Sequence, residues 1–458
     1  MNPSISSPNV LLLTIDTLRA DLLGCYGYPN ALTPNLDRLA SQGIRFNQAI
    51  TGGSWTQAAF PVLLTSTPAS SFGGCLGPLA PERPSPVEVF SRSGYRTFGL
   101  SSNPLLSRKY GYDRGFGVFE DLKPGEKDPP LRQMKGGQFL LRSPLFHALS
   151  GRRGKNMRPA RKYVSAERLN ARAMDLLAAG EGPSFGWIHY MDVHWPCHLQ
   201  EDLATPRQIA QAWTDIIHLH RVNWKHAAIS PEQRDRYLDL YEKAVRYVDG
   251  QIGRLLDGLQ ERGLAENTIV VVLSDHGEEF LERGRWGHFE TNLYDEILKV
   301  PLIFRLPGRS GGSVVRSQVR TLDIMPTLLQ LCGIPRPAGL EGRSLKQLWT
   351  VGENALESGP AVSEMWRDHW HIIAVRTEAF KYIWNSRTPE QPKLFDLQQD
   401  PQETENVIAQ YPDTAHELQD LVDQRLADAR RTRPEKAQSA PEHDGEMIAR
   451  LRDLGYLE

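Results

Sequence analysis

Cysteine is scarce in this 458-residue sequence, and its four cysteines, Cys25, Cys75, Cys197 and Cys332, form no CxxC pair. Their spacing argues against a structural zinc ribbon and a disulfide framework, and it fits reduced thiols in a cytosolic protein. A basic leader is also missing, and the first apolar run stops at Asp16, too short for a signal sequence or a membrane span. We therefore expect a cytoplasmic protein without a membrane span.

An excess of one charge is missing as well. The formal net charge of -2 gives the whole molecule no preference for nucleic acid or for an anionic membrane, so any such preference must be local. Walker and dinucleotide-binding glycine spacings are absent, which argues against a loop that cradles a nucleotide. Hydrophobic residues at 40% and charged residues at 24% are ordinary globular values, and the length favours one large domain with a smaller companion.

The sequence alternates between strand and helix patterns. Short apolar runs that end beside polar residues predict strands, and amphipathic stretches between them predict helices. We expect strands over residues 10–15, 95–100, 185–190, 268–273 and 300–304, and helices over 33–43 and 232–262. The alternation predicts an α/β fold with a mixed, mostly parallel sheet sandwiched by helices.

Two regions interrupt this alternation. An insert at about residues 125–165 contains a stretch, 131–165, without any acidic residue, whose nine basic residues are Arg132, Lys135, Arg142, Arg152, Arg153, Lys155, Arg158, Arg161 and Lys162. We interpret it as a solvated surface loop, slightly ahead of a lid that draws an anionic substrate inward. The polar tail after Arg425 predicts an exposed linker before a last short helix.

Four polar residues form a pattern with chemical meaning. Asp16 ends the first predicted strand, Asp275 and His276 follow another, and Thr56 lies in the segment GGSWTQAAF. Alone, Asp16 would fit a helix cap and Thr56 a loop hydroxyl. Because the carboxyl ends of parallel strands meet at one edge of a sheet, the residues can share a site there. Two carboxylates, an imidazole and a hydroxyl suit a divalent cation.

The segments around these residues resemble, in order, the sulfatase branch of the alkaline phosphatase superfamily. The resemblance covers nearly the whole chain and rests on PNVLLLTIDTLRADLLGCYGY, TPNLDRLASQGIRF, VVLSDHGEEFLERGRWGH, LYDEILKVPLIFRLPG, DIMPTLLQLCGIPRPAGLEGRSL and KLFDLQQDPQETENV. It implies an alkaline-phosphatase-like catalytic domain over residues 1–350 and a smaller α+β C-terminal subdomain with a tail over 351–458. It also implies a hydrolase that acts on a small anionic sulfate or phosphate ester.

The resemblance implies that Asp16, Asp275 and His276 ligate one divalent metal, with Thr56 as nucleophile completing the shell. Such a cation lowers the pKa of an attacking hydroxyl and offsets charge in the transition state. Thr17 stands where many sulfatases have a further Asp ligand. The missing carboxylate makes Ca²⁺ less favoured and leaves Mg²⁺, Mn²⁺ and Zn²⁺ open.

The nucleophile segment departs from the family pattern. Sulfatases carry a Cys or Ser, within a CxPSR-like signature, that is oxidised to formylglycine, whereas residues 56–60 of this chain are TQAAF. Threonine cannot become formylglycine, so we expect attack by Thr56 itself. This arrangement is similar to nucleotide pyrophosphatase and phosphoethanolamine transferase relatives in the superfamily, which moves the expectation toward phosphoryl chemistry.

Further residues are candidates for contact with the substrate. The resemblance places His194 in a PHxP-like position near the leaving group, where it would act as general acid, and His288 near a substrate-binding or metal-ligating position. Arg19 and Asn103 are further candidates for binding the substrate anion. Each has an alternative: Arg19 can pair with an acid, and Asn103 can be a turn residue. The family's usual Lys and His are replaced by Ser102 and Pro104.

Histidines near the predicted strand 185–190 leave a second metal open. His194 and His288, together with Asp192, could hold it as in two-zinc relatives, although one metal is favoured. His189 and His198 fit packing or hydrogen-bonding roles. Two rivals to the hydrolase remain: a phosphoryl or phosphoethanolamine-type transferase with the same site, and a metal-retaining protein without turnover.

Overall fold

The fold is organised around strand β1 (Asn9–Ile15), whose residues NVLLLTI are almost all buried. The structure is a computed structural model and describes residues 7–125, 128–152, 157–225, 227–288, 291–367, 370–434 and 443–454. Strand β1 lies between β5 (Ser184–Tyr190) and β6 (Thr268–Ser274) and is parallel to both. Because apolar residues occupy both faces of these three strands, they form the centre of the sheet.

The other strands extend this sheet on both sides. Their order is β11 (Ser313–Arg320), β2 (Ile44–Ile50), β10 (Leu302–Arg305), β6, β1, β5, β3 (Arg96–Ser101) and β4 (Val118–Asp121), with β9 (Lys299–Val300) paired to β2 outside this path. Strand β10 is antiparallel to both of its neighbours, and β9 is antiparallel to β2. The sheet is therefore mixed and mostly parallel, as predicted.

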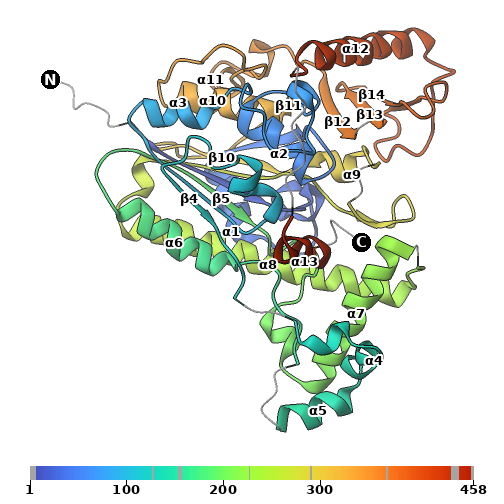
Figure 1. Cartoon of the computed structure of the whole chain (residues 1–458). Helices are drawn as coiled ribbons and strands as arrows, with labels where there is room; N and C mark the ends of the chain where they lie inside the picture. Colours follow the sequence, from blue (N-terminus) through green and yellow to red (C-terminus); the bar gives the residue numbers. More distant parts are fainter. Residues whose placement is uncertain are drawn as a thin grey trace.

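Helices cover both faces of the sheet (Figure 1). Along β1, Leu11 and Leu13 belong to one core and Val10 and Leu12 to the other, as the alternation of a strand requires. The first core is closed by α1 (Pro34–Gln42), α6 (Ala166–Ala178) and α8 (Pro231–Glu261), and the second by α2 (Thr56–Thr65), α3 (Pro86–Arg92) and α10 (Ile324–Leu331).

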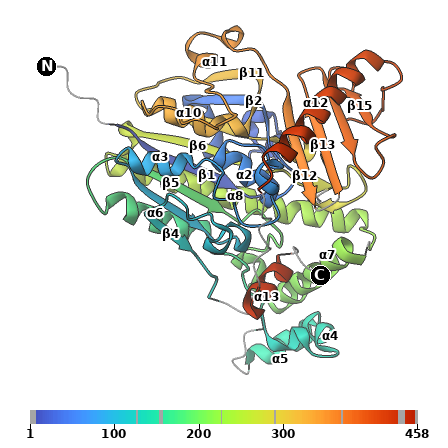
Figure 2. The same cartoon turned by 45° about the horizontal axis from the view of Figure 1, so that its top comes forward.

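A smaller antiparallel sheet follows the large one (Figure 2). Its strands are β12 (Ala361–Arg367), β13 (Trp370–Arg376), β14 (Phe380–Asn385) and β15 (Lys393–Asp396), and helix α12 (Pro412–Arg431) packs against it through an apolar core. The short helices α9 (Asp295–Leu298) and α11 (Gln347–Thr350) lie in the connections. The last helix, α13 (Gly445–Asp453), returns to the large domain, where Arg450 donates to the carbonyl of Ser102.

Several predicted elements need correction. Residues 300–304 were expected to form one strand, but Pro301 separates β9 from β10 because proline cannot donate to the ladder. The linker expected after Arg425 begins later, since α12 continues to Arg431 and Arg425 is itself buried. The last short helix is present as α13, and residues 435–442 of the tail lie outside the described part of the chain.

The basic insert is only partly a loop, because its middle is helical while Arg158, Arg161 and Lys162 lie outside helices. It contains α4 (Gly137–Leu141) and α5 (Pro144–Arg152), which pack against α7 (Pro206–Lys225) and extend from one end of the molecule (Figure 1). A helical period is hard to recognise there because apolar residues occur on more than one face of α5. Within the described part of the chain, no helix has the length and apolar character needed to cross a membrane.

Candidate active site

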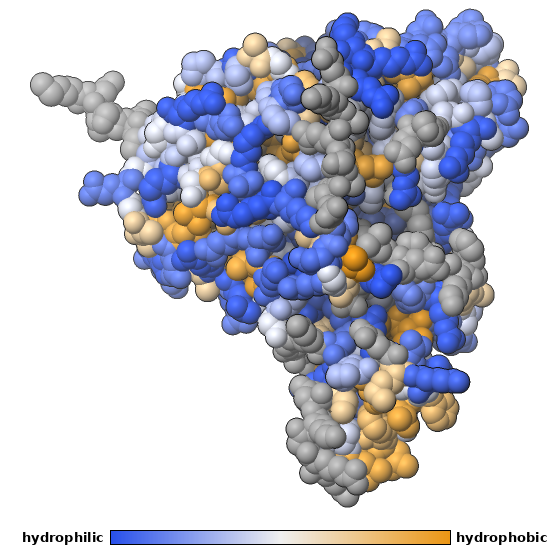
Figure 3. All heavy atoms as spheres, viewed as in Figure 1, coloured by the Kyte–Doolittle hydropathy of each residue, from blue (hydrophilic) through white to orange (hydrophobic). Residues whose placement is uncertain are grey.

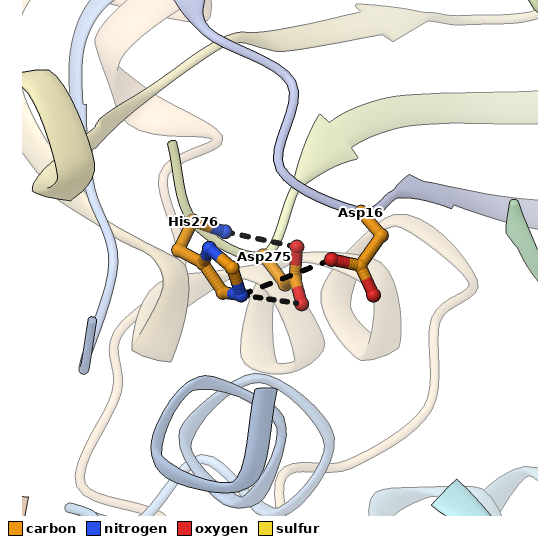
Figure 4. A group of neighbouring side chains, drawn as sticks. All are labelled: Asp16, Asp275 and His276. Atoms are coloured by element: carbon orange, nitrogen blue, oxygen red, sulfur yellow. Dashed lines mark hydrogen bonds and ion pairs between the residues drawn. The ribbon is translucent and has the colours of Figure 1, made fainter. Parts of the chain in front are cut away.

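Three side chains that are typical metal ligands meet at one edge of the large sheet (Figure 4). Ile15 of β1 pairs with Ser274 of β6. The residues that follow them, Asp16 and Asp275, therefore lie side by side just beyond the ends of two neighbouring strands. His276 Nε2 lies 3.8 Å from Asp16 Oδ1 and 3.5 Å from Asp275 Oδ2. All three residues are buried. The predicted convergence at the carboxyl ends of the strands is thus present.

Other contacts fix the orientation of the Asp275 and His276 side chains. Asp275 Oδ1 accepts from the amides of Thr17 (3.3 Å) and His276 (3.0 Å). His276 Nδ1 lies 2.9 Å from the carbonyl of Gly277, so Nδ1 carries the proton and Nε2 presents its lone pair. Thr17 has a φ of 60°, which is costly for a β-branched residue and brings its amide to Asp275.

Asp16 is held in the same way through its second oxygen. Asp16 Oδ2 accepts from Asn103 Nδ2 (3.3 Å) and from His189 Nε2 (3.1 Å), while His189 Nδ1 accepts from the hydroxyl of Thr14 (2.9 Å). Asn103 also caps a short turn, because its Oδ1 accepts from the amide of Leu105. His189 therefore has the hydrogen-bonding role expected of it, and its partner is a candidate metal ligand.

The atoms that remain point at one another. Asp16 Oδ1, Asp275 Oδ2 and His276 Nε2 are buried and have no hydrogen-bond partner. Buried polar atoms are normally paired, so three such acceptors facing a common point indicate a missing electron-pair acceptor. Two carboxylate oxygens and one imidazole nitrogen fit a divalent metal ion. Within the described residues, this trio is the only such group.

The pKa values of the trio reflect the proximity of two acids. Burial, and then the charge of Asp16, raise the pKa of Asp275 to about 7. Burial would also raise the pKa of Asp16, but nearby imidazoles, His194 first, outweigh it and hold that pKa below its usual range. Burial lowers the pKa of His276, which favours the neutral form that binds metals. A cation would keep both carboxylates ionised.

Thr56 is the first residue of α2 and is completely buried. The segment on each side of it is tied to the trio. Before it, the Thr51 hydroxyl donates to the carbonyl of Asp275 (2.5 Å). After it, Phe60 packs edge-on against His189 with 4.9 Å between ring centroids. Residues four apart share one face of a helix, so Thr56 lies on the face of α2 that Phe60 turns toward His189.

His194 and His288 lie next to the trio. The ring centroid of His288 is 4.5 Å from that of His276 and 5.2 Å from that of His194. His194 Nδ1 contacts the carbonyl of Trp195 (2.7 Å), and His288 Nδ1 donates to Glu278 Oε1 (3.1 Å). Burial lowers the pKa of His194 and of His288. The structure therefore brings both histidines to the site, together with Glu278, which the sequence did not single out.

Arg19 and Asp192 have other partners. Arg19 is bound to Asp21 (2.6 Å) and Glu282 (2.5 Å), and it also donates to the carbonyl of Glu278 (3.0 Å). Its pairing with acids is the alternative considered above. Asp192 accepts from Arg161 (2.7 Å) and from the amide of Ala166 (3.0 Å). A second metal that uses Asp192 would have to break these contacts.

Comparisons with known proteins agree with this geometry. Residues 8–334 match the sulfatase family, and residues 284–432 match the C-terminal region of N-sulphoglucosamine sulphohydrolase. Since the first match spans most of the chain, the protein belongs to the sulfatase family, and this places it among the ester hydrolases.

Individual relatives are similar over nearly the whole length. An arylsulfatase of Clostridium perfringens is 26% identical over 453 residues, which cover 88% of this chain and 90% of that protein. The phosphonate monoester hydrolase of Agrobacterium radiobacter has a TM-score of 0.68 at 21% identity, covering 92% and 96%. BT4656 in complex with D-glucosamine-2-N,6-O-disulfate has a TM-score of 0.71 at 19% identity, covering 94% and 100%. These structures confirm the predicted fold.

Proposed function

We propose that this protein is a metal-dependent hydrolase of a small anionic sulfate or phosphate ester and that Thr56 is its nucleophile, without formylglycine. The observation that carries the proposal is the buried trio of unpartnered ligand atoms on Asp16, Asp275 and His276. The sulfatase and phosphonate monoester hydrolase relatives support ester hydrolysis. Catalysis is assigned to residues 1–350, with 351–458 as the smaller subdomain and tail.

The trio would hold one divalent cation. When bound, the cation supplies Lewis-acid stabilisation of the negative charge on the hydroxyl oxygen and on the ester. Two carboxylates with one imidazole suit Mn²⁺ or Zn²⁺ well and also admit Mg²⁺ or Ca²⁺. Asn103 and His189 act through Asp16, because their hydrogen bonds keep one oxygen occupied and leave the other for the ion.

Thr56 attacks from the amino end of α2. The Thr56 hydroxyl gives its proton to water, and its oxygen forms a bond to sulfur or phosphorus while the bond to the leaving oxygen breaks. Water then hydrolyses the covalent intermediate and restores the hydroxyl. The partial positive charge at a helix amino end favours both an alkoxide and an ester anion, which supports this position for the reaction. His288 is assigned to the substrate anion and is oriented by Glu278, whereas Arg19 would have to leave Asp21 or Glu282 before it could bind the anion.

His194 is assigned as the acid that protonates the leaving oxygen. Burial lowers its pKa, so the protonated form becomes common only below the pH at which an ordinary histidine titrates. The reaction should therefore slow as the pH rises through the His194 pKa, and it should slow most for esters with poor leaving groups. A His194→Gln variant should lose this pH dependence and should retain more activity toward a nitrophenyl ester than toward an alkyl ester.

The decisive experiment compares aryl sulfate, aryl phosphate and bis-aryl phosphate substrates, with chelator or with Mg²⁺, Mn²⁺, Zn²⁺ or Ca²⁺. Turnover should require a metal, and Thr56→Ala should abolish it, a loss of about 10³-fold or more. Thr56→Ser should keep part of the activity because it retains the hydroxyl. Thr350→Ala, an exposed threonine in α11, is the matched control and should behave as the parent.

Two results would redirect the proposal. Transfer of the group to an added alcohol faster than to water would identify a transferase with the same residues. Full biological function of Thr56→Ala would rule out catalysis through Thr56 and favour a metal-retaining protein without turnover. The four free thiols are compatible with a reducing cytoplasm, which we propose as the compartment.

A further inference from the structure

Helices α4 and α5 form a packed tip at one end of the molecule (Figure 1). We use the term tip for residues 130–152. Its inner side packs against α7, where Leu141 is buried in a small core with Trp213 and Ile216. Trp213 Nε1 also donates to the carbonyl of Met157 (2.8 Å). The outer side of the tip is therefore supported from behind by a small hydrophobic core.

That outer side is apolar. The exposed fractions are 77% for Phe139, 68% for Leu145 and 60% for Met134, and Leu149 and Leu140 follow at 51% and 41%. These five are most of the exposed large hydrophobic residues in the described part of the chain. Figure 3 shows the resulting apolar area at this end of the molecule. Leu145 and Leu149 are one helical turn apart, so they share one face of α5.

The charge around this apolar face is positive. Lys135 and Arg142 are exposed and lie on either side of Phe139 in the sequence. The stretch 131–165 contains no acidic residue at all. Three basic side chains of the insert do meet acids: Arg132 of the tip and Lys162 (2.5 Å) both pair with Asp128, and Arg161 pairs with Asp192 (2.7 Å). The outward surface thus combines large apolar side chains with cations.

We infer that the tip is a docking surface for an anionic lipid bilayer. Amphipathic helices with Phe and Leu on one side and Lys or Arg beside them bind in the interface plane, where the apolar groups enter the acyl boundary and the cations meet lipid phosphates. This mode needs no membrane-spanning helix. A second copy of the chain fits the tip less well, because a symmetric contact would bring together two surfaces that both carry the positive charges of Lys135 and Arg142.

The tip is also connected to the candidate active site. Trp195 packs against the core of the tip, and it directly follows His194, whose Nδ1 contacts the Trp195 carbonyl. Arg161 reaches Asp192 in the same segment. The surface and the site therefore belong to one packed unit, so a chain docked through its tip would hold its site in a constant relation to the bilayer.

Vesicle co-sedimentation of the full chain tests this inference. We expect binding to vesicles of phosphatidylcholine mixed with phosphatidylglycerol and little binding to phosphatidylcholine alone. Lys135→Gln combined with Arg142→Gln should weaken the binding roughly 30-fold, from about two charge contacts of the usual strength. Phe139→Ser combined with Leu145→Ser should weaken it at least about tenfold. Val351→Ser is the matched control, since Val351 is 77% exposed outside the tip.

Several results would overturn the inference. Equal binding to both kinds of vesicle, or no binding by the parent chain, would exclude an anionic bilayer as the partner. Equal loss of binding in the Val351→Ser control would show that the tip is not the surface used. The parent chain could also form a dimer in sedimentation velocity, and loss of this dimer in the Phe139→Ser, Leu145→Ser variant would assign the surface to a second copy.

Unchanged melting temperatures of the variants would show that the chain remains folded.

Discussion

Two buried clusters of charged residues in this molecule differ in how their negative charge is balanced. At the edge of the large sheet, Asp16 and Asp275 face each other across His276, and three of their acceptor atoms have no partner. Near the small sheet, Asp295 and Glu403 both contact Lys381, whose Nζ lies 2.5 Å and 2.6 Å from their oxygens. The second cluster contains its own cation, and the first does not.

The pKa values express the same difference. Burial would raise the pKa of Asp295, but Lys381 and then Arg376 outweigh it and hold that pKa below the usual range. The pKa of Asp275 is instead raised to about 7, by burial and by Asp16. The charge of the Asp16 and Asp275 pair can be reduced by a proton on Asp275 or, under the proposed function, by a cation from solution. The comparison therefore separates a cluster built for binding from one built for stability.

The largest effect is expected at the first cluster. Asp275→Asn removes a carboxylate ligand, so we expect loss of bound metal and a fall in turnover of about 10³-fold, equivalent to several kcal/mol of transition-state stabilisation. Metal analysis and kcat/KM measure the two effects. Asp257→Asn, an exposed acid at the surface, should change neither. Full metal content and activity in Asp275→Asn would show that the first cluster does not bind a metal through Asp275.

Lys381→Met should act on stability instead. The variant leaves Asp295 and Glu403 buried without their shared cation, which costs about 3–5 kcal/mol of unfolding free energy. Urea unfolding measures this loss, and the fraction that remains folded should still bind the metal. Lys393→Met replaces an exposed lysine of the same subdomain and serves as control. A stable variant that has lost its metal would contradict the assignment of the two clusters.

The pH dependence of metal binding should follow from Asp275. Its pKa is raised in the metal-free folded chain, so the folded state binds a proton more tightly than the unfolded state does. Stability of the metal-free chain therefore falls as the pH rises from about 4 to about 7, and a metal ion restores it. Melting curves should show a larger metal-induced increase, by a few degrees, near pH 8 than near pH 5. An equal increase would argue against ligation by Asp275.

The smallest effect is expected for Glu278→Gln. Burial raises the pKa of Glu278 to about 8, so the experiment is run above that pH, where Glu278 is charged. Glutamine can still accept a hydrogen bond from His288 Nδ1 but carries no charge, and the difference between the two kinds of bond is about 1 kcal/mol. We expect turnover to fall about fivefold with metal content unchanged. His288→Ala should cost more, and adding Glu278→Gln to it should cost nothing further. Additive losses would show that Glu278 does not act through His288.

The central strands and the trio of Asp16, Asp275 and His276 could both be predicted from the sequence because the trio directly follows two of these strands. Buried parallel strands have continuous apolar runs, and Asp16, Asp275 and His276 directly follow two of them. The break at Pro301 and the reversed direction of β10 were missed, because a short apolar run carries no information about its partner. The role of Glu278 was missed because Glu278 and Glu279 are neighbours of the same type, and only the fold decides which one meets His288.

The tip shows another limit of sequence analysis. Its basic residues were recognised, but the same stretch was expected to be a loop. Whether Phe139, Leu145 and Leu149 face a core or solvent depends on where α7 lies, and α7 begins more than fifty residues later in the chain. The pairing of Arg161 with Asp192 is likewise a product of the fold.

The place of β1 in the sheet also sets the order of events during synthesis. Both of its neighbours are made much later, since β5 begins at Ser184 and β6 at Thr268. At about 5–20 residues per second, roughly 13–50 s separate the translation of the two strands that the trio follows. The edge of β1 that pairs with β6 therefore stays open after β5 has been made, until Asp275 emerges, and binding of the proposed metal would report that the central sheet has closed.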